Sequence, residues 1–171
     1  HHHLTKQLQA REFNREYQAI VGGVMTAGGT IDAPIGRHPT QRIKMAVLED
    51  SHTAKEAITH YRVEKKFRSH TLINVKLETG RTHQIRVHMA YIKYPILGDP
   101  AYAGRLRIPS AASDHFLDGI RNFKRQALHA KTLGFIHPEK EEYMEWSVEM
   151  PEDMQEIINL LEEDLASHDN I

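Results

Sequence analysis

The segment LETGRTHQIRVH, from Leu77 to His88, places two Arg, two His, two Thr and one Gln beside a single Gly. A solvated surface helix would instead favour Glu, Lys and Ala. Such a density of hydrogen-bonding side chains at the start of a predicted helix indicates that the segment binds something. The alternative is a capped helix whose polar side chains are satisfied within the fold.

Thr79 and Gly80 stand where a predicted strand becomes a predicted helix. The exposed N–H groups at a helix start attract anions, and the helix dipole adds to this attraction. We expect Arg81 and Thr82 in the first helical turn, where they would extend this attraction into a phosphate clamp.

Arg86 is predicted to lie one turn further along the same helix. At about 100° per residue it shares a face with Thr82, while Ile85, Met89 and Ile92 form an apolar stripe facing the core. A guanidinium near the edge of such a stripe is seldom left unpaired. We therefore expect a buried carboxylate partner in bidentate geometry.

A metal site built on His83 and His88 is the competing interpretation of the segment. Five residues correspond to about 140° around a helix, so the two rings do not converge on one ion. The chain has no Cys. This excludes a disulfide scaffold, a Cys-ligated zinc site and a thiolate nucleophile, and it suits a reducing cytoplasm.

The net charge of −1 conceals a strong segregation of charge along the chain. Residues 1–138 hold 21 of the 22 Lys and Arg but only 11 of the 23 Asp and Glu, an excess of ten positive charges. An excess of this size predicts contact with a polyanion such as RNA. The alternative is a scattered, solvated basic surface.

Strand and helix patterns alternate irregularly, which predicts a single α+β domain over residues 4–171. His1 to His3 are typical of a purification tag, and no apolar run approaches the roughly 20 residues of a membrane span. Residues 31–47 and 94–105 are expected to be mostly loop. The predicted strands are 13–25, 56–67, 71–80, 127–138 and 143–151, and the predicted helices are 4–9, 81–92, 113–124 and an amphipathic one with Met154, Ile157, Ile158, Leu161 and Leu165 on one face.

The stretch LETGRTHQIRVHMAYIKYPILGDPAYAG resembles the RluA-type pseudouridine synthases. Gly80 to His88 is similar to the arginine motif of this family, and Pro95 to Pro100 resembles the Pro-x-x-Gly-Asp-Pro segment that follows it. Upstream, REYQAIV around Tyr17 is similar to the family's tyrosine motif, and QALHAKTLGFIHP to its Leu-His-Ala strand. The resemblance runs from about Leu4 to the C-terminus.

The resemblance implies a pseudouridine-synthase-type fold, with a mixed, largely antiparallel sheet and flanking helices. It implies isomerisation of uridine in 23S ribosomal RNA without metal or cofactor, in which the base is flipped out, detached from C1′ and rejoined through C5. The family's catalytic residue is an Asp; Arg86 matches the arginine paired with it, and Tyr17 matches the tyrosine that stacks on the flipped uracil. The expected RNA contacts are Arg81, Thr82, His83 and Gln84.

The His-Arg-Leu-Asp motif that carries the family's catalytic Asp is absent from this sequence. Asp99, in the Gly-Asp-Pro loop, is interpreted as structural, so no carboxylate of the chain is expected beside Arg86. Residues 4–171 are therefore expected to be the C-terminal portion of a catalytic domain, without that motif and without an S4-type RNA-binding domain.

Three further expectations follow from this truncation. The isolated chain is expected to be inactive. Its incomplete sheet is expected to expose strand edges, which favour self-association. The alternative function is a non-catalytic RNA-binding fragment.

Overall fold

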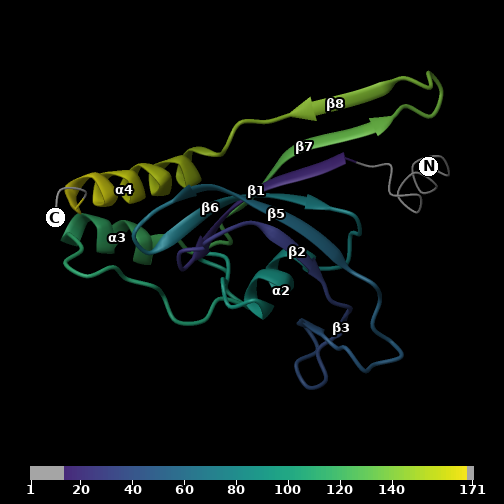
Figure 1. Ribbon diagram of the computed structural model, residues 1–171, viewed down its shortest axis with the longest axis horizontal. Coiled ribbons are helices and arrows are strands. Elements are labelled where there is room, and N and C mark those ends of the chain that lie inside the picture. The colour runs from purple at the N-terminus through teal and green to yellow at the C-terminus, as the bar shows by residue number, and fades with distance from the viewer. Residues whose placement is uncertain (1–13, 169–171) are drawn as a thin grey trace.

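The computed structural model describes residues 14–168, in which one large sheet is flanked by helices (Figure 1). Six strands form the sheet in the order β2-β5-β6-β1-β7-β8, and every neighbouring pair is antiparallel. This confirms the expected α+β class with a largely antiparallel sheet. The strands are β1 (Asn14–Gly22), β2 (Gly29–Asp32), β5 (Ile58–Lys66), β6 (His70–Leu77), β7 (Leu128–Ile136) and β8 (Tyr143–Ser147).

Three helices and a small ribbon complete the described part of the chain. The ribbon pairs β3 (Ile35–Arg37) with β4 (Met45–Val47). The helices are α2 (Gln84–Tyr91), α3 (Asp114–Asn122) and α4 (Glu152–His168). The helix expected over residues 4–9 lies outside the described residues.

The sheet centre is formed by β1 and β6. β6 is buried over its first six residues because the strand is covered on both faces. β1 pairs with β6 on one side and β7 on the other, so Tyr17 lies opposite Val75 and Ala130. An irregularity in the pairing with β7 falls between Glu16 and Tyr17. Such bulges change the direction of a side chain and occur next to functional sites.

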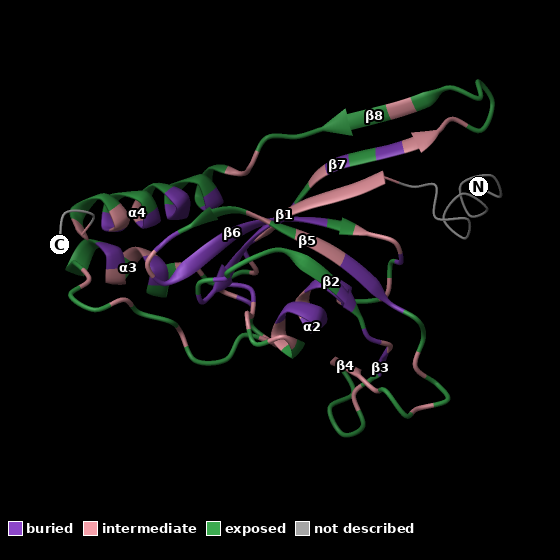
Figure 2. Cartoon of the chain, viewed as in Figure 1, coloured by how far each residue is buried: buried purple, intermediate pink, exposed green. Residues whose placement is uncertain are grey.

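Helices α3 and α4 cover one end of the sheet (Figure 2). The predicted apolar stripe of α4 is confirmed: Met154, Ile157, Ile158 and Leu161 are buried in the main core, and Leu165 packs against them. Burying such side chains contributes roughly 1.5–3 kcal/mol each. The other face of α4 carries exposed acidic side chains, but Asp164 is an exception: it is buried and accepts a hydrogen bond from Arg68 at 3.0 Å.

The loop expected over residues 31–47 contains the end of β2 and the whole of β3 and β4. These strands span only three or four residues, too short to show an alternating pattern in the sequence. Among the described residues, β2 and β8 are the outermost strands of the sheet. Within residues 14–168 no helix is both long and apolar enough to cross a membrane.

Candidate active site

Tyr17 of β1 and Arg86 of α2 line the same pocket, which has a volume of about 280 Å³. The strand–turn–helix order of residues 70–91 brings the arginine segment back against the middle of β1. No Asp or Glu of residues 14–168 lines this cavity. We call it the Tyr17–Arg86 pocket, and its lining is Arg15, Tyr17, Leu77, Gly80, Arg81, His83, Gln84, Ile85, Arg86, Gln126 and Leu128.

Arg86 has the bidentate carboxylate partner that its helical position predicts, and this partner is Asp99. Nε of Arg86 donates to Oδ2 at 2.8 Å and Nη2 donates to Oδ1 at 2.9 Å. Backbone N–H groups of Ala101 and Tyr102 also donate to Oδ1. Burial raises the pKa of Asp99, but these hydrogen bonds outweigh it and hold that pKa below its ordinary value. The Asp99 hydrogen bond in turn raises the pKa of Arg86.

The expectation that no carboxylate of this chain stands beside Arg86 is therefore wrong. Asp99 lies 13 residues further along the sequence, in a loop whose path the sequence pattern does not reveal. Its side chain is fully buried, and it is absent from the lining of the Tyr17–Arg86 pocket. This position, in contact with Arg86 but outside the pocket, agrees with the interpretation of Asp99 as structural.

Tyr102 supports the same arginine from a second direction. The Arg86 guanidinium lies 4.9 Å from the centre of the Tyr102 ring, a cation–π distance. The Tyr102 hydroxyl accepts from the Met45 backbone N–H at 2.8 Å and lies 2.7 Å from Nδ1 of His83. Burial, together with the charge of Arg86, lowers the pKa of His83. No pattern in the sequence had predicted this role of Tyr102.

Gln84 was an expected RNA contact, and the structure shows its side-chain polar atoms bonded within the fold. Its side chain is buried, and its amide oxygen accepts from Thr79 Oγ1 and from the Arg81 backbone N–H. Its amide nitrogen donates to the Ile58 carbonyl and to Thr59 Oγ1. These four bonds use the full capacity of the amide. Gln84 therefore fixes the turn before α2 and has no hydrogen bond left for RNA.

The expected position of Arg81 and Thr82 within the first helical turn is also wrong. α2 begins at Gln84, and His83 before it has a left-handed backbone with φ of 57°. Arg81 lines the Tyr17–Arg86 pocket, although its Nε donates to the Glu56 carbonyl at 2.7 Å. Thr82 is exposed and lines a different cavity, beside β3. The turn therefore presents Arg81 and His83 to the pocket, but not Thr82.

Arg15 is a pocket residue that the sequence analysis missed. Its Nε is buried without a hydrogen-bond partner among the described residues, and burial lowers its pKa. A Cβ added to Gly80 would collide with the Arg15 guanidinium, so the glycine makes room for it. Arg15 stands two residues before Tyr17 on the same strand, and residues two apart share a face of a sheet. That alternation could have identified it.

His88, the other histidine of the proposed metal pair, has partners different from those of His83. Its Nδ1 lies 2.7 Å from Thr59 Oγ1 and its Nε2 lies 2.8 Å from the Ala33 carbonyl. The fully buried ring therefore connects α2 to two segments of the sheet region. Among residues 14–168, no cluster of three or more His, Asp or Glu side chains suits a metal ion.

Comparison with known proteins places this geometry in a family. The profile described as RNA pseudouridylate synthase matches residues 1–91, so the chain belongs to that family. Relatives from Pseudomonas aeruginosa and Escherichia coli K12, both named ribosomal large subunit pseudouridine synthase D, are 55% and 52% identical over 164 and 165 residues. Each alignment covers 96% of this chain and 50% of the relative. The chain thus spans about half the length of these relatives.

Two solved structures share the fold. The human RNA pseudouridylate synthase domain containing 4 superposes with a TM-score of 0.72 at 26% identity, covering 94% of this chain and 67% of that one. For the human domain containing 1 the TM-score is 0.66 at 25% identity, with 85% and 58% covered. The expected pseudouridine-synthase-type fold is confirmed.

Proposed function

We propose that this chain forms the uridine-binding part of the active site of a pseudouridine synthase acting on 23S ribosomal RNA in the cytoplasm. The observation that carries the proposal is the meeting of Tyr17 and Arg86, from distant parts of the sequence, in one pocket. Membership of the RNA pseudouridylate synthase family supports the reaction, and the names of the relatives support the ribosomal substrate.

In this proposal Tyr17 stacks on the uracil that has been flipped out of the RNA. Extruded bases are held between aromatic or apolar side chains, and Leu77 and Leu128 line the same pocket. The Tyr17 hydroxyl then stands near the base edge, where it assists removal of the C5 proton after the base has turned. The cations Arg15 and Arg81 attract the neighbouring phosphates.

Arg86 is proposed to pair with the catalytic Asp that the family resemblance implies. A guanidinium has five N–H donors, and Asp99 takes two of them. The other donors remain for a second carboxylate, which would come from outside residues 14–168. That carboxylate would act at C1′ or the adjacent sugar carbon while the bond between C1′ and N1 breaks. Asp99 and Tyr102 fix the orientation of Arg86 and do not touch the substrate.

The proposal is tested by a chimera in which this chain replaces the matching half of the Escherichia coli relative. The assay is tritium release from ribosomal RNA that carries uridine tritiated at C5. We expect the chimera to release tritium and the 171-residue chain alone to release none. Release by the chain alone, or a folded chimera without activity, contradicts the proposal.

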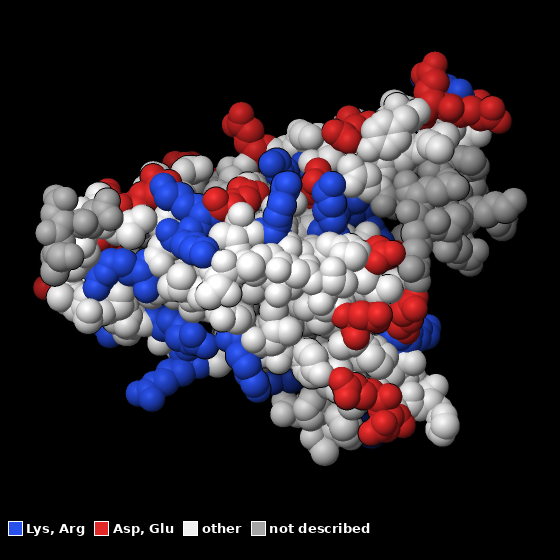
Figure 3. Space-filling view, viewed as in Figure 1, with Lys and Arg blue, Asp and Glu red and all other residues white. Residues whose placement is uncertain are grey.

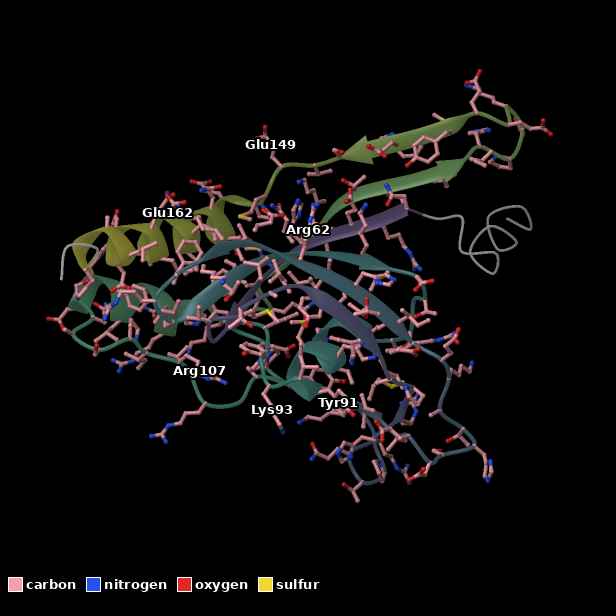
Figure 4. The ribbon with its side chains drawn as sticks, viewed as in Figure 1. Arg62, Tyr91, Lys93, Arg107, Glu149 and Glu162 are labelled. Atoms are coloured by element: carbon pink, nitrogen blue, oxygen red, sulfur yellow. The ribbon has the colours of Figure 1, made fainter. Side chains whose placement is uncertain are left out.

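Tyr17 variants of the chimera test its assigned role. Tyr17→Leu should reduce tritium release at least about 10²-fold because it removes both the stacking ring and the hydroxyl. Tyr17→Phe should keep RNA affinity but lose turnover. The matched control is Tyr91→Leu, at an exposed tyrosine of α2 (Figure 4), which should leave the rate unchanged. Activity of Tyr17→Leu close to that of the parent would make Tyr17 only a packing residue.

A non-catalytic RNA-binding fragment is the second candidate function. It is favoured by one observation, that no carboxylate of residues 14–168 lines the Tyr17–Arg86 pocket. An inactive chimera that still binds ribosomal RNA would support it. Self-association through the sheet edges stays a prediction, which sedimentation velocity of the 171-residue chain would test.

A further inference from the structure

A second cavity, of about 480 Å³, lies where β1 ends at Gly22. His70, the first residue of β6, also lines it from the sheet side. The opposite side is formed by residues 95–100, residues 103–107 and the end of α3. We call it the His70 cavity. Its lining shares no residue with the Tyr17–Arg86 pocket, so what it binds can be established independently of pseudouridine synthesis.

His70 is a buried polar group that the fold does not satisfy. The residue is 1% exposed, and its Nδ1 lies 2.7 Å from Ser69 Oγ. Its Nε2 is buried and has no hydrogen-bond partner among the described residues. Burial, with a smaller effect of Arg107, lowers the pKa of His70 to about 4, so the ring is neutral at pH 7. An unsatisfied buried nitrogen is costly, and His70 is one of the residues that line the cavity.

The walls of the cavity are apolar. Ile96 and Ile120 are 1% exposed, and Phe123 supplies an aromatic ring. Pockets that bind small organic molecules combine such walls with a few polar groups that fix orientation. The apolar lining consists of Pro95, Ile96, Leu97, Leu106, Ile120 and Phe123.

The rim of the cavity is cationic. Arg107 lies over Gly22, where an added Cβ would come within 3.2 Å of its Cγ, and its Nη2 donates to the Lys93 carbonyl at 3.1 Å. Figure 4 labels Arg107 and Lys93 on the same side of the molecule, and Figure 3 shows basic side chains gathered there. The exposed cations of the lining are Arg105, Arg107, Arg121 and Lys124.

The cavity has one carboxylate in its lining, and it does not offset these cations. Both carboxylate oxygens of Asp99 already accept hydrogen bonds, from Arg86 and from two backbone N–H groups. An anion at the rim therefore meets uncompensated positive charge. Inorganic phosphate alone would leave the apolar walls uncovered, and an aliphatic anion would leave the His70 nitrogen unpaired.

We propose that the His70 cavity binds a nucleotide unit, with the base between the apolar walls and the phosphate on the cationic rim. A nucleobase has flat apolar faces and hydrogen-bonding groups along its edge. It can therefore cover the walls and pair with Nε2 of His70 at the same time. The unit comes either from a free mononucleotide or from a nucleotide extruded from an RNA chain.

The experiment is a titration of the 171-residue chain followed by NMR of the histidine side-chain nitrogens. The probes are the four nucleoside monophosphates, with uridine and ribose 5-phosphate as partial ligands. We expect saturable shifts of the His70 ring and of the Gly22 and Gly98 amides with at least one monophosphate. Each partial ligand should bind about tenfold more weakly or worse, because it lacks either the phosphate or the base.

Two variants and a matched control accompany the titration. Arg107→Ala should weaken binding about tenfold by removing one charged contact, whereas Arg62→Ala, an exposed arginine of β5 (Figure 4), should not. Gly104→Trp adds a large ring to an exposed residue of the cavity lining and should weaken binding. A Cβ at Gly104 meets no atom within 4 Å, so this variant is expected to fold.

A ribosomal RNA stem-loop forms the second arm and identifies the source of the nucleotide. If the His70 resonances shift only with RNA, the cavity binds a nucleotide extruded from the RNA chain. If they shift with a monophosphate and added RNA does not displace that monophosphate, the cavity binds a free mononucleotide. The proposal is overturned if neither probe moves the His70 resonances, or if Arg107→Ala binds like the parent. Tritium release by the chimera is a separate readout, so the two proposals can fail independently.

Discussion

Arg86 and Asp99 form a buried ion pair next to the Tyr17–Arg86 pocket. The side chains are 13% and 0% exposed, and two parallel hydrogen bonds join them. Removing one member of such a buried pair leaves an uncompensated charge, which typically costs about 3–5 kcal/mol. The orientation of Arg86 therefore depends on a residue that does not itself line the pocket.

We expect Asp99→Asn to lower the free energy of unfolding by about 3 kcal/mol at pH 7, measured by urea denaturation. The matched control is Asp153→Asn. Asp153 makes the same bidentate contact with Arg125, at 2.7 and 2.8 Å, but the side chains are 48% and 43% exposed. Exposed pairs contribute about 0–1 kcal/mol, so the control should lose no more than that.

The Asp99 effect should also depend on pH in a defined direction. The folded-state pKa of Asp99 lies below its ordinary value of about 3.9. The pair therefore contributes its full stability above that ordinary value, and this stability is lost as the pH falls through the folded-state pKa. The difference between parent and Asp99→Asn should shrink as the pH is lowered below about 4. A difference that stays constant into acid would argue against the ionic nature of the contact.

At the scale of elements, residues 95–105 determine where Asp99 lies. Gly98 has a left-handed backbone with φ of 75°, and an added Cβ would collide with the carbonyl oxygen of Arg125. The loop is pinned to the sheet through the Leu97 backbone, which donates to the Ile20 carbonyl and accepts from the Ala127 N–H. The conformation next to Asp99 therefore requires a residue without a side chain.

Gly98→Ala should destabilise the protein by more than about 1 kcal/mol, because backbone strain and a backbone collision add together. Thermal unfolding followed by circular dichroism measures this. Gly104→Ala in the same loop is the matched control, since its Cβ would meet open space. Equal melting temperatures for the two variants would show that the Gly98 conformation is not required.

The sequence predicted some elements of the fold and of the site well and others poorly. Two long segments joined by a short polar stretch predicted β5 and β6, and a periodic apolar face predicted α4. The start of α2 was predicted three residues too early, since a left-handed His83 has no sequence signal of its own. The helical position of Arg86 predicted that it pairs with a carboxylate, but it did not predict that Asp99 is this carboxylate. That contact depends on how a loop folds back, which local pattern does not encode.

On the face drawn in Figure 3, side chains of one charge sign gather in several places, although basic and acidic side chains also lie next to one another above the sheet. Figure 3 shows acidic side chains along α4 and at the tip of the hairpin formed by β7 and β8. Basic side chains gather below α3 and along the loop that precedes it. Residues 1–138 carry the excess of ten positive charges. A separation of this kind orients the molecule on a polyanion, with the acidic elements turned away from it.

We therefore expect the affinity of the chain for a ribosomal RNA stem-loop to fall as salt is added. A plot of the logarithm of the binding constant against the logarithm of the salt concentration should be a straight line with a negative slope. Each cation that contacts a phosphate contributes roughly 0.7–0.9 to the slope, so Arg105→Gln with Arg107→Gln should reduce it by between about 1 and 2. Lys140→Gln is the matched control, because Lys140 lies among Glu139, Glu141 and Glu142 at the hairpin tip and should leave the slope unchanged. Fluorescence anisotropy at five salt concentrations measures the three slopes. A flat dependence for the parent, or an equal loss in the control, would mean that the basic side of the molecule is a solvated surface and not the RNA-binding face.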